Sequence, residues 1–167
     1  MDEAPARLRS KASWLINKIA PHAHRLLAEG LAPVDGRGYH LAVLAALAEY
    51  GPASQASVGQ RCGIDRSDTH AVVNELAGQG LVVRAPDLQD RRRNVVTVTP
   101  AGLKRLEQLD EVARQVQDSL LVALSPTERR QLVELLGRVF DSHQTPPTQG
   151  RAPRGGAAEP AGGAPAR

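Results

Sequence analysis

Apolar residues recur at steps of three and four along most of this chain, which is the period of an amphipathic helix. The helices predicted in this way cover residues 8–27, 39–50, 55–62, 66–77, 100–123 and 126–142. Pro21 lies inside the first of these patterns, and proline removes a helical hydrogen bond. We therefore expect the first helix to be kinked or divided at Pro21.

A different period appears between the fourth and fifth predicted helices. Residues 81–84 and 94–99 are rich in valine, and the second stretch alternates through Val96 and Val98. Alternation of this kind predicts two short strands, with residues 85–93 as the turn between them. The predicted fold class is therefore mainly α with a small β-hairpin, in the order four helices, hairpin, two helices.

Helix starts are marked by residues that accept hydrogen bonds from free backbone N–H groups. Ser54 and Asp65 precede the third and fourth predicted helices, and Thr99 followed by Pro100 precedes the fifth. Residues 125–128 read Ser-Pro-Thr-Glu, which predicts a capping box with proline at the first helical position.

The end of the chain has a different composition. Residues 144–167 contain five prolines and five glycines in 24 residues and no large apolar side chain. Nothing in this segment offsets the entropy lost on ordering it. We expect a folded region over residues 1–143 and a disordered tail over 144–167.

The formal net charge is +3, and most of it lies in this tail. Arg151, Arg154 and Arg167 against Glu159 contribute +2, which leaves +1 for the other 143 residues. Net charge is therefore weak evidence for nucleic-acid binding, and basic residues must be judged by where the fold places them.

Composition also limits the cellular setting and the chemistry. Cys62 is the only cysteine and cannot form an internal disulfide, which is typical of a reducing compartment. No apolar run approaches the ~20 residues of a membrane span, and the N-terminus lacks a signal peptide, so we expect a cytoplasmic protein with no membrane contact. P-loop, Rossmann, zinc-protease and nucleophile-elbow motifs are absent from the sequence, so we expect no enzymatic activity, cofactor or bound metal.

Two short helices followed by a hairpin form the part of the pattern that points to function. Residues 55–62 and 66–77 are joined by a tight turn that contains Gly63, which is typical of a helix-turn-helix. The hairpin that follows makes this a winged helix-turn-helix. Three consecutive arginines lie on its turn, where they would meet DNA phosphates and the negative potential of a narrow minor groove.

At this point the chain resembles the MarR (multiple antibiotic resistance regulator) family of bacterial transcription factors. The matching segments are VGQRCGIDRSDTHAVVNELAGQGLVVR, DLQDRRRNVVTVTPAG and the long helix that follows, and the resemblance covers roughly residues 10–143. It implies a DNA-binding core at about residues 39–99 and a homodimer formed through the first and last helices. It further implies a ligand-responsive repressor of a pseudo-palindromic operator, with half-sites ~34 Å apart.

The resemblance also assigns DNA contacts to two segments. On the wing, Asp90 and Arg92 match an aspartate that orients the wing and an arginine that enters the minor groove. The full set of predicted DNA-binding residues is Arg66, Ser67, His70 and Asn74 on the recognition helix and Asp90, Arg91, Arg92 and Arg93 on the wing. Many family members have serine in place of His70, which indicates a different operator sequence. The alternative for the wing is a solvated turn with ordinary surface arginines.

Family members bind small aromatic or phenolic anions between the dimerisation helices and the winged domain. Trp14 and His40 are the predicted ligand-binding residues, and Arg9, Lys11 or Arg37 would supply the positive charge. The alternative for Trp14 is packing at a dimer interface.

Two further groups of residues carry candidate chemistry. Cys62 is expected to be a small core residue. A zinc site made by His22, His24, His40 and Glu29 has no tight ligand spacing to support it. The competing function for the whole chain is a winged-helix protein-interaction module without sequence-specific DNA binding.

Overall fold

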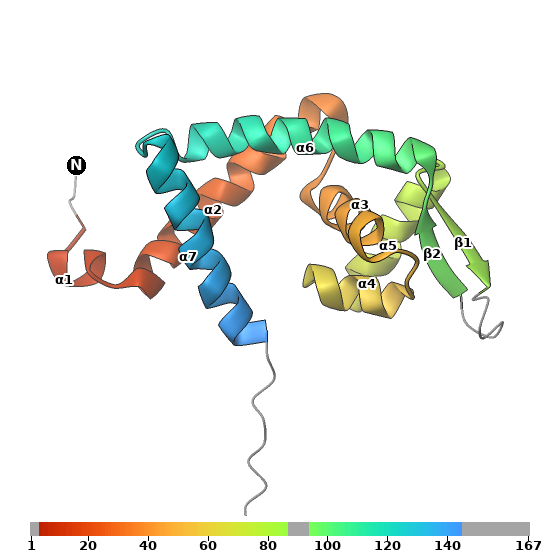
Figure 1. Cartoon of the computed structure of the whole chain (residues 1–167), viewed down its shortest axis with the longest axis horizontal. Coiled ribbons are helices and arrows are strands. Elements are labelled where there is room, and N and C mark those ends of the chain that lie inside the picture. The colour runs from red at the N-terminus through yellow and green to blue at the C-terminus, as the bar shows by residue number, and fades with distance from the viewer. Residues whose placement is uncertain (1–3, 87–93, 145–167) are drawn as a thin grey trace, which may run out of the picture. The chain divides into compact units, whose positions relative to one another are not determined.

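The structure of the chain is a computed structural model that describes residues 4–86 and 94–144 (Figure 1). The elements, in chain order, are α1 (Ala6–Arg9), α2 (Ala12–Leu31), the 3-10 turn η1 (Ala32–Val34), α3 (Gly38–Tyr50), α4 (Gln55–Cys62), α5 (Arg66–Gly78), β1 (Val82–Pro86), β2 (Asn94–Val98), α6 (Pro100–Leu120) and α7 (Pro126–Gln144). The fold class predicted from the sequence, helices with one small hairpin, is confirmed. None of the described helices is long and apolar enough to cross a membrane.

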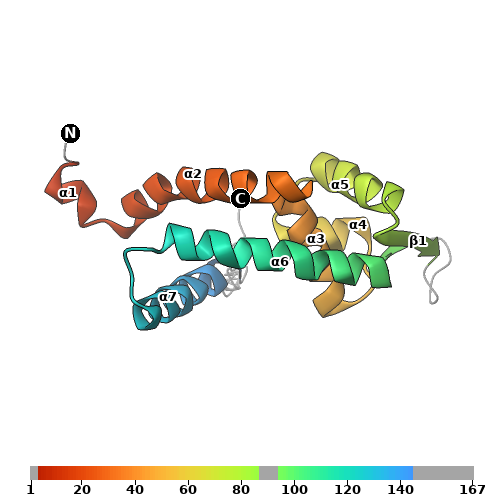
Figure 2. The same cartoon turned by 90° about the horizontal axis from the view of Figure 1, so that it is seen from above.

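The chain forms two units, Met1–Ala123 and Leu124–Arg167. In the first unit, the long helices α2 and α6 run side by side, and α3, α4, α5 and the hairpin lie together at one end of the pair (Figure 2). The second unit contributes α7 to the described residues. The described residues end at Gln144, the last residue of α7, so residues 145–167 of the predicted tail lie outside them.

The hairpin is antiparallel, with Val82 opposite Val98 and Pro86 opposite Asn94. It is extended by one residue from outside the two strands. Ala53, in the segment before α4, pairs with Val96 of β2 through two backbone hydrogen bonds, at 2.8 and 3.1 Å. This single antiparallel bridge lies on the side of β2 away from β1. This bridge fixes the hairpin to the start of α4, and the sequence pattern had not indicated it.

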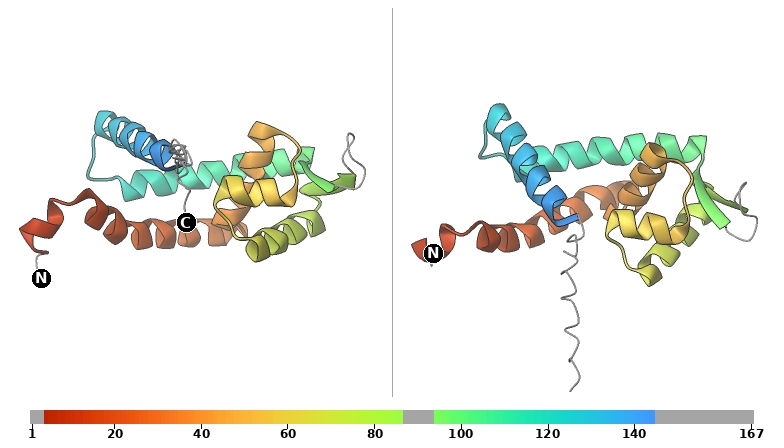
Figure 3. Two further views of the ribbon diagram at one scale, coloured as in Figure 1. Left: turned by 90° about the horizontal axis from the view of Figure 1, so that it is seen from below. Right: turned by 60° about the horizontal axis from the view of Figure 1, so that its bottom comes forward.

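The core lies where α3, α4, α5 and the hairpin meet. Its side chains are all aliphatic, and they come from every element of this end of the unit: Leu31, Val43, Leu44, Leu47, Ala53, Val58, Ile64, Val72, Val73, Leu76, Leu81, Val82, Val96 and Leu109. Because α5 contributes one full face to this core, its opposite face is held outward at a defined angle. Figure 3 shows α4 and α5 packed side by side beneath α3.

The first predicted helix is divided, but not at Pro21 as the sequence had suggested. α2 runs through Pro21 without a break, and the interruption falls at Lys11, whose backbone is extended (φ −106°, ψ 115°). The Ser10 hydroxyl donates to the Arg7 carbonyl at 3.0 Å and ends α1. Pro21 and Asn17 are both exposed, so water can satisfy the Asn17 carbonyl that has lost its helical donor.

The predicted helix starts are confirmed by their hydrogen bonds. The side chains of Ser54, Asp65 and Thr99 accept from backbone N–H groups three residues later, at 3.2, 2.8 and 3.0 Å. In the second unit, Ser125 and Glu128 form the reciprocal capping box, at 2.8 and 3.4 Å. Local pairs of this kind are readable from sequence because both partners lie within one turn.

Candidate nucleic-acid interface

The turn between α4 and α5 is built around Gly63. This residue has φ +63°, in the left-handed region that glycine adopts without a Cβ penalty, and it ends α4. The next residue, Ile64, turns into the core and donates its N–H to the Gly59 carbonyl at 2.9 Å. Asp65 then caps α5. The predicted helix-turn-helix is present, with its turn at residues 63–65.

α4 and α5 approach closely at Gly59 and Thr69. The Thr69 hydroxyl is buried and donates to the Asp65 carbonyl at 2.6 Å. A Cβ at position 59 would lie 2.5 Å from Thr69 Oγ1 and 3.1 Å from the Ile64 carbonyl oxygen. Gly59 therefore allows α5 to pack against α4 with its first turn held in place.

The four predicted recognition-helix residues are all exposed on α5. They alternate with the buried Thr69, Val72, Val73 and Leu76, which form the opposite face. Ser67 Oγ donates to Asp65 Oδ1 at 2.7 Å, and Asn74 Nδ2 lies 2.8 Å from His70 Nδ1. Because the amide nitrogen donates, the Nδ1 atom of His70 accepts, and the ring proton of His70 is on Nε2.

The N-terminus of α5 carries a carboxylate in its cap. The backbone N–H of Asp68 and then the hydroxyl of Ser67 hold the pKa of Asp65 below its ordinary value. The cap is therefore Asp65, while Asp68 is an exposed residue of the first turn that donates its backbone N–H. Arg66 sits between these two acidic residues and presents the first positive charge of the helix.

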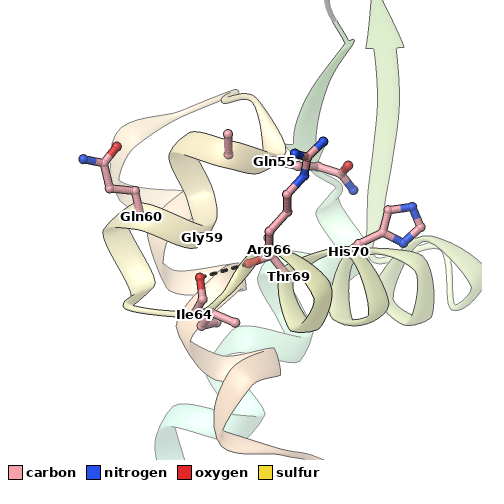
Figure 4. A pocket seen from close by; sticks show the side chains of 8 residues that line it. Gln55, Gly59, Gln60, Ile64, Arg66, Thr69 and His70 are labelled. Carbon is pink, nitrogen blue, oxygen red and sulfur yellow. Dashed lines mark hydrogen bonds between the residues drawn. The ribbon is translucent and has the colours of Figure 1, made fainter.

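A cavity of about 500 Å³ opens between α4 and α5 (Figure 4). Arg66 and His70 line it together with Gln55 and Gln60 from α4. Gln55 Nε2 is buried and is the one such side-chain nitrogen or oxygen without a hydrogen-bond partner in the described part of the chain. A buried donor without a partner is costly, so Gln55 is a candidate contact for an acceptor that enters this cavity. No sequence signal had marked it, because its place depends on how α4 packs against α5.

The described residues include the two strands of the wing but not residues 87–93 between them. β1 and β2 differ slightly from the predicted ranges, since β1 continues to Pro86 and β2 ends at Val98. The predicted wing residues Asp90, Arg91, Arg92 and Arg93 lie outside the described residues. Their role in DNA binding stays a prediction from the sequence.

A second cavity, of about 640 Å³, lies between the end of α2 and the start of α3, and we call it the α2–α3 cavity. Its lining residues are His24, Leu27, Ala28, Ala32, Asp35, Gly36, Arg37, Gly38 and Tyr39. Of the three cations that the sequence offers as partners for an anion, Arg37 is the one in this lining. Arg37 also precedes α3 as its N-cap residue.

The predicted ligand residues Trp14 and His40 are not brought together. Trp14 is half-buried on α2, with Lys18 Nζ 5.7 Å from the centre of its ring. Thirteen positions separate it from Leu27 at the α2–α3 cavity, which is about 20 Å along a helix. His40 is next to that cavity in sequence, but it is only 4% exposed and does not line it.

His40 instead bonds to the recognition helix. Its Nε2 lies 3.0 Å from Oε2 of Glu75 on α5, and Arg37 Nη1 lies 3.2 Å from the other carboxylate oxygen, Oε1. A carboxylate only accepts, so the His40 Nε2 atom carries the proton and donates. The hydrogen bond from His40, followed by the charge of Arg37, lowers the pKa of Glu75. Glu75 had not been singled out from the sequence, because its partners lie 35 and 38 residues away.

We expect the Glu75 pairing to make stability depend on pH. A carboxyl whose folded pKa is lowered stabilises the fold above its unfolded pKa of about 4.3, and that contribution is lost as pH falls through the folded value. Glu75→Gln is therefore expected to be less stable than the wild type at neutral pH and equally stable at low pH. Denaturant midpoints measured across this range test the prediction, and a constant difference between the two proteins would contradict it. Glu29→Gln, which removes the carboxylate of an exposed i,i+4 pair with Arg25, is the control.

The remaining candidate groups can be placed directly. Cys62 is half-buried against the core; its thiol donates to the Ala42 carbonyl at 3.4 Å, and burial raises its pKa. The grouping of His22, His24, His40 and Glu29 weighed as a zinc site is not formed. Across residues 4–86 and 94–144, no three His, Cys, Asp or Glu side chains are placed to share a metal ion.

A helix-turn-helix whose second helix is exposed on one face, followed at once by a hairpin, defines a winged helix-turn-helix protein. Comparison with known proteins gives the family. The model of the MarR family matches residues 29–93. The chain belongs to the MarR family of transcriptional regulators.

Individual relatives resemble the chain over most of its length. It is 25% identical over 144 residues to the HTH-type transcriptional repressor NicR of Pseudomonas putida, covering 86% of this chain and 91% of NicR. Bordetella bronchiseptica BpsR, solved in work on regulation of its DNA binding by 6-hydroxynicotinic acid, aligns with TM-score 0.71 and 25% identity, over 83% of this chain and 99% of BpsR. A probable transcriptional regulator from Pseudomonas aeruginosa aligns with TM-score 0.68 and 30% identity, over 80% of this chain and 99% of its own.

Proposed function

We propose that this MarR-family regulator represses transcription by binding a pseudo-palindromic operator as a homodimer, and that a small aromatic or phenolic acid releases it. The observation that carries the proposal is the outward polar face of α5. Arg66, His70 and Asn74 are exposed on a helix whose other face is fixed in the core. A helix held in this way presents side chains to base edges in the major groove.

Each of these side chains has a chemistry suited to duplex DNA. The guanidinium of Arg66 binds a phosphate or a guanine edge, and the Nε2–H of His70 donates to an acceptor on a base or phosphate. The Asn74 amide has both a donor and an acceptor and fits an adenine edge. Arg91, Arg92 and Arg93 supply the minor-groove and phosphate contacts of the wing in this proposal.

Exposed apolar side chains support the proposed homodimer. In the first unit they are Leu8, Leu15, Ile16 and Ile19; in the second unit they are Val133, Leu135, Leu136, Val139 and Phe140 on α7. Apolar faces of this extent mark interaction surfaces rather than ordinary solvent-exposed helices. A two-fold dimer through these helices would space two recognition helices ~34 Å apart, one turn of DNA.

The relatives support both repression and an aromatic acid as effector. NicR is a repressor, and the DNA binding of BpsR is regulated by 6-hydroxynicotinic acid. In this chain the α2–α3 cavity has suitable chemistry. Arg37 offers a cation for a carboxylate, and Tyr39 and His24 offer ring surface and polar atoms for a substituted aromatic ring.

Arg66→Ala is expected to weaken binding to operator DNA, identified by selection from a random duplex library, about 10-fold or more while the protein stays folded and dimeric. The reason is the loss of a charged contact at the N-terminal end of the recognition helix. Fluorescence anisotropy titrations measure the change. Arg25→Ala, which removes an exposed arginine from α2, is the matched control and is expected to bind as the wild type does. Equal affinities of both variants for operator DNA would favour the protein-interaction module instead.

A further inference from the structure

Arg37 belongs to two sites at once. Arg37 is a lining residue of the α2–α3 cavity, and its guanidinium is paired with Glu75 of α5 at 3.2 Å. Of the residues that line the cavity, Arg37 is the one with a permanent positive charge, and Asp35 is the one carboxylate. A ligand with a carboxylate and a separate hydrogen-bond donor matches this pair of charges, and its carboxylate must take Arg37 as partner.

Glu75 holds the recognition helix to the start of α3. It lies between the exposed Asn74 and the buried Leu76, at the edge between the outward face of α5 and the core. Its two partners, Arg37 and His40, are the N-cap residue of α3 and a residue of its first turn. The N-terminal end of a helix carries partial positive charge, which further favours a carboxylate at this place.

The two bonds to Glu75 differ in how easily they are exchanged. The His40 side chain is 5% exposed, so its bond to Glu75 is shielded from solvent. The Arg37 side chain is 66% exposed, and an ion pair that is exposed to this degree is weak and readily replaced. A carboxylate bound in the α2–α3 cavity is therefore expected to replace the Arg37–Glu75 ion pair and to leave the His40–Glu75 hydrogen bond in place.

We propose that Arg37 is a positioning residue that couples the α2–α3 cavity to the recognition helix: an acid bound in the cavity takes the guanidinium from Glu75 and loosens α5 from α3. This inference rests on the proposed function, since it supplies the route by which the acid releases DNA. The coupling is limited by the strength of an exposed ion pair, so the expected loss of operator affinity is about fivefold for each protomer. By reciprocity, bound operator DNA weakens acid binding by the same factor. Glu75 also weakens acid binding, by about fivefold, because the acid must displace it from Arg37.

The test uses the full chain, 4-hydroxybenzoate as the acid and 4-hydroxybenzamide as its uncharged counterpart. Calorimetry gives the affinity for each compound, and anisotropy gives operator affinity with and without it. Glu75→Gln keeps a hydrogen-bond acceptor for His40 but removes the charge that competes for Arg37. Glu29→Gln is the matched control, because it neutralises a carboxylate in the exposed Arg25 pair of α2.

In the wild type and in Glu29→Gln, the acid is expected to bind and to weaken operator binding, and the amide is expected to do neither. In Glu75→Gln the Arg37 pair is already lost, so operator affinity without the acid is expected to be lower than in the wild type by about fivefold for each protomer. The acid is expected to bind this variant about fivefold more tightly than the wild type and to cause no further loss of operator affinity. Tighter acid binding is a readout that simple loss of structure would not produce. Circular dichroism checks that Glu75→Gln is folded. Arg37→Ala, which removes the shared cation, is expected to lose acid binding.

Two contrary results separate this inference from the function it rests on. If the acid weakens operator binding equally in the wild type and in Glu75→Gln, the Arg37–Glu75 coupling is wrong and the ligand-released repressor stands. If the acid neither binds the wild type nor changes its operator affinity, both the assignment of the cavity and the coupling are wrong, while DNA binding by the wild type would still be measured.

Discussion

Gly102→Ala is expected to destabilise the first unit by about 3 kcal/mol, a large effect for the addition of a single methyl group. Gly102 is buried where α6 begins, and its N–H donates to the cap oxygen of Thr99 at 3.0 Å. A Cβ there would overlap the Leu81 carbonyl oxygen and lie 2.8 Å from Val98 Cγ2. Because the nearest atom is a backbone carbonyl oxygen, rotation of a side chain cannot relieve the overlap.

Thermal or urea unfolding of the purified variant measures the effect. Gly78→Ala is the matched control, since a Cβ added at position 78, in the last turn of α5, would meet no neighbouring heavy atom within 4 Å. At position 78, alanine is expected to stabilise the folded protein by about 0.5 kcal/mol, because it lowers the conformational entropy of the unfolded chain. A Gly102→Ala protein as stable as the wild type would show that α6 does not approach Leu81 as closely as described.

Replacement of Arg91, Arg92 and Arg93 by alanine is expected to lower operator affinity by about 100-fold at physiological salt. The three charges would otherwise neutralise phosphates or enter the minor groove, with release of counterions. The slope of log affinity against log salt is therefore expected to fall by about 3. Anisotropy titrations at several salt concentrations give both quantities, and the dimer is expected to remain intact.

The chain offers a control with the same change in net charge. Replacement of Arg151, Arg154 and Arg167 in the tail by alanine also removes three positive charges. Because the tail is not part of the proposed interface, the affinity and the salt slope are expected to stay near the wild-type values. Equal losses in the two triple variants would mean that overall charge, and not the wing, governs binding.

Sequence reasoning succeeded where partners are close along the chain. Ser54, Asp65 and Thr99 were recognised as cap residues because their acceptor atoms and N–H donors lie three residues apart. The outward face of α5 followed from helical periodicity, which places its buried residues on the other side.

The failures have equally physical causes. Pro21 was expected to kink or divide the first helix, but α2 continues through it, because water can bond to the exposed Asn17 carbonyl. The helix is divided instead at Lys11, whose backbone is extended. The Ala53–Val96 bridge and the bonds of Glu75 to Arg37 and His40 join segments at least 35 residues apart. Side-chain type does not specify such pairs; only packing of the helices brings them together.

Selection of bound sequences from a random duplex library, with purified full-length protein at physiological salt, tests the central claim most directly. A sequence-specific dimeric repressor is expected to recover a pseudo-palindrome whose half-sites lie one helical turn, ~34 Å, apart. Recovery of no motif by protein shown to be folded and dimeric would contradict operator recognition by α5 and would favour a winged-helix module that binds another protein.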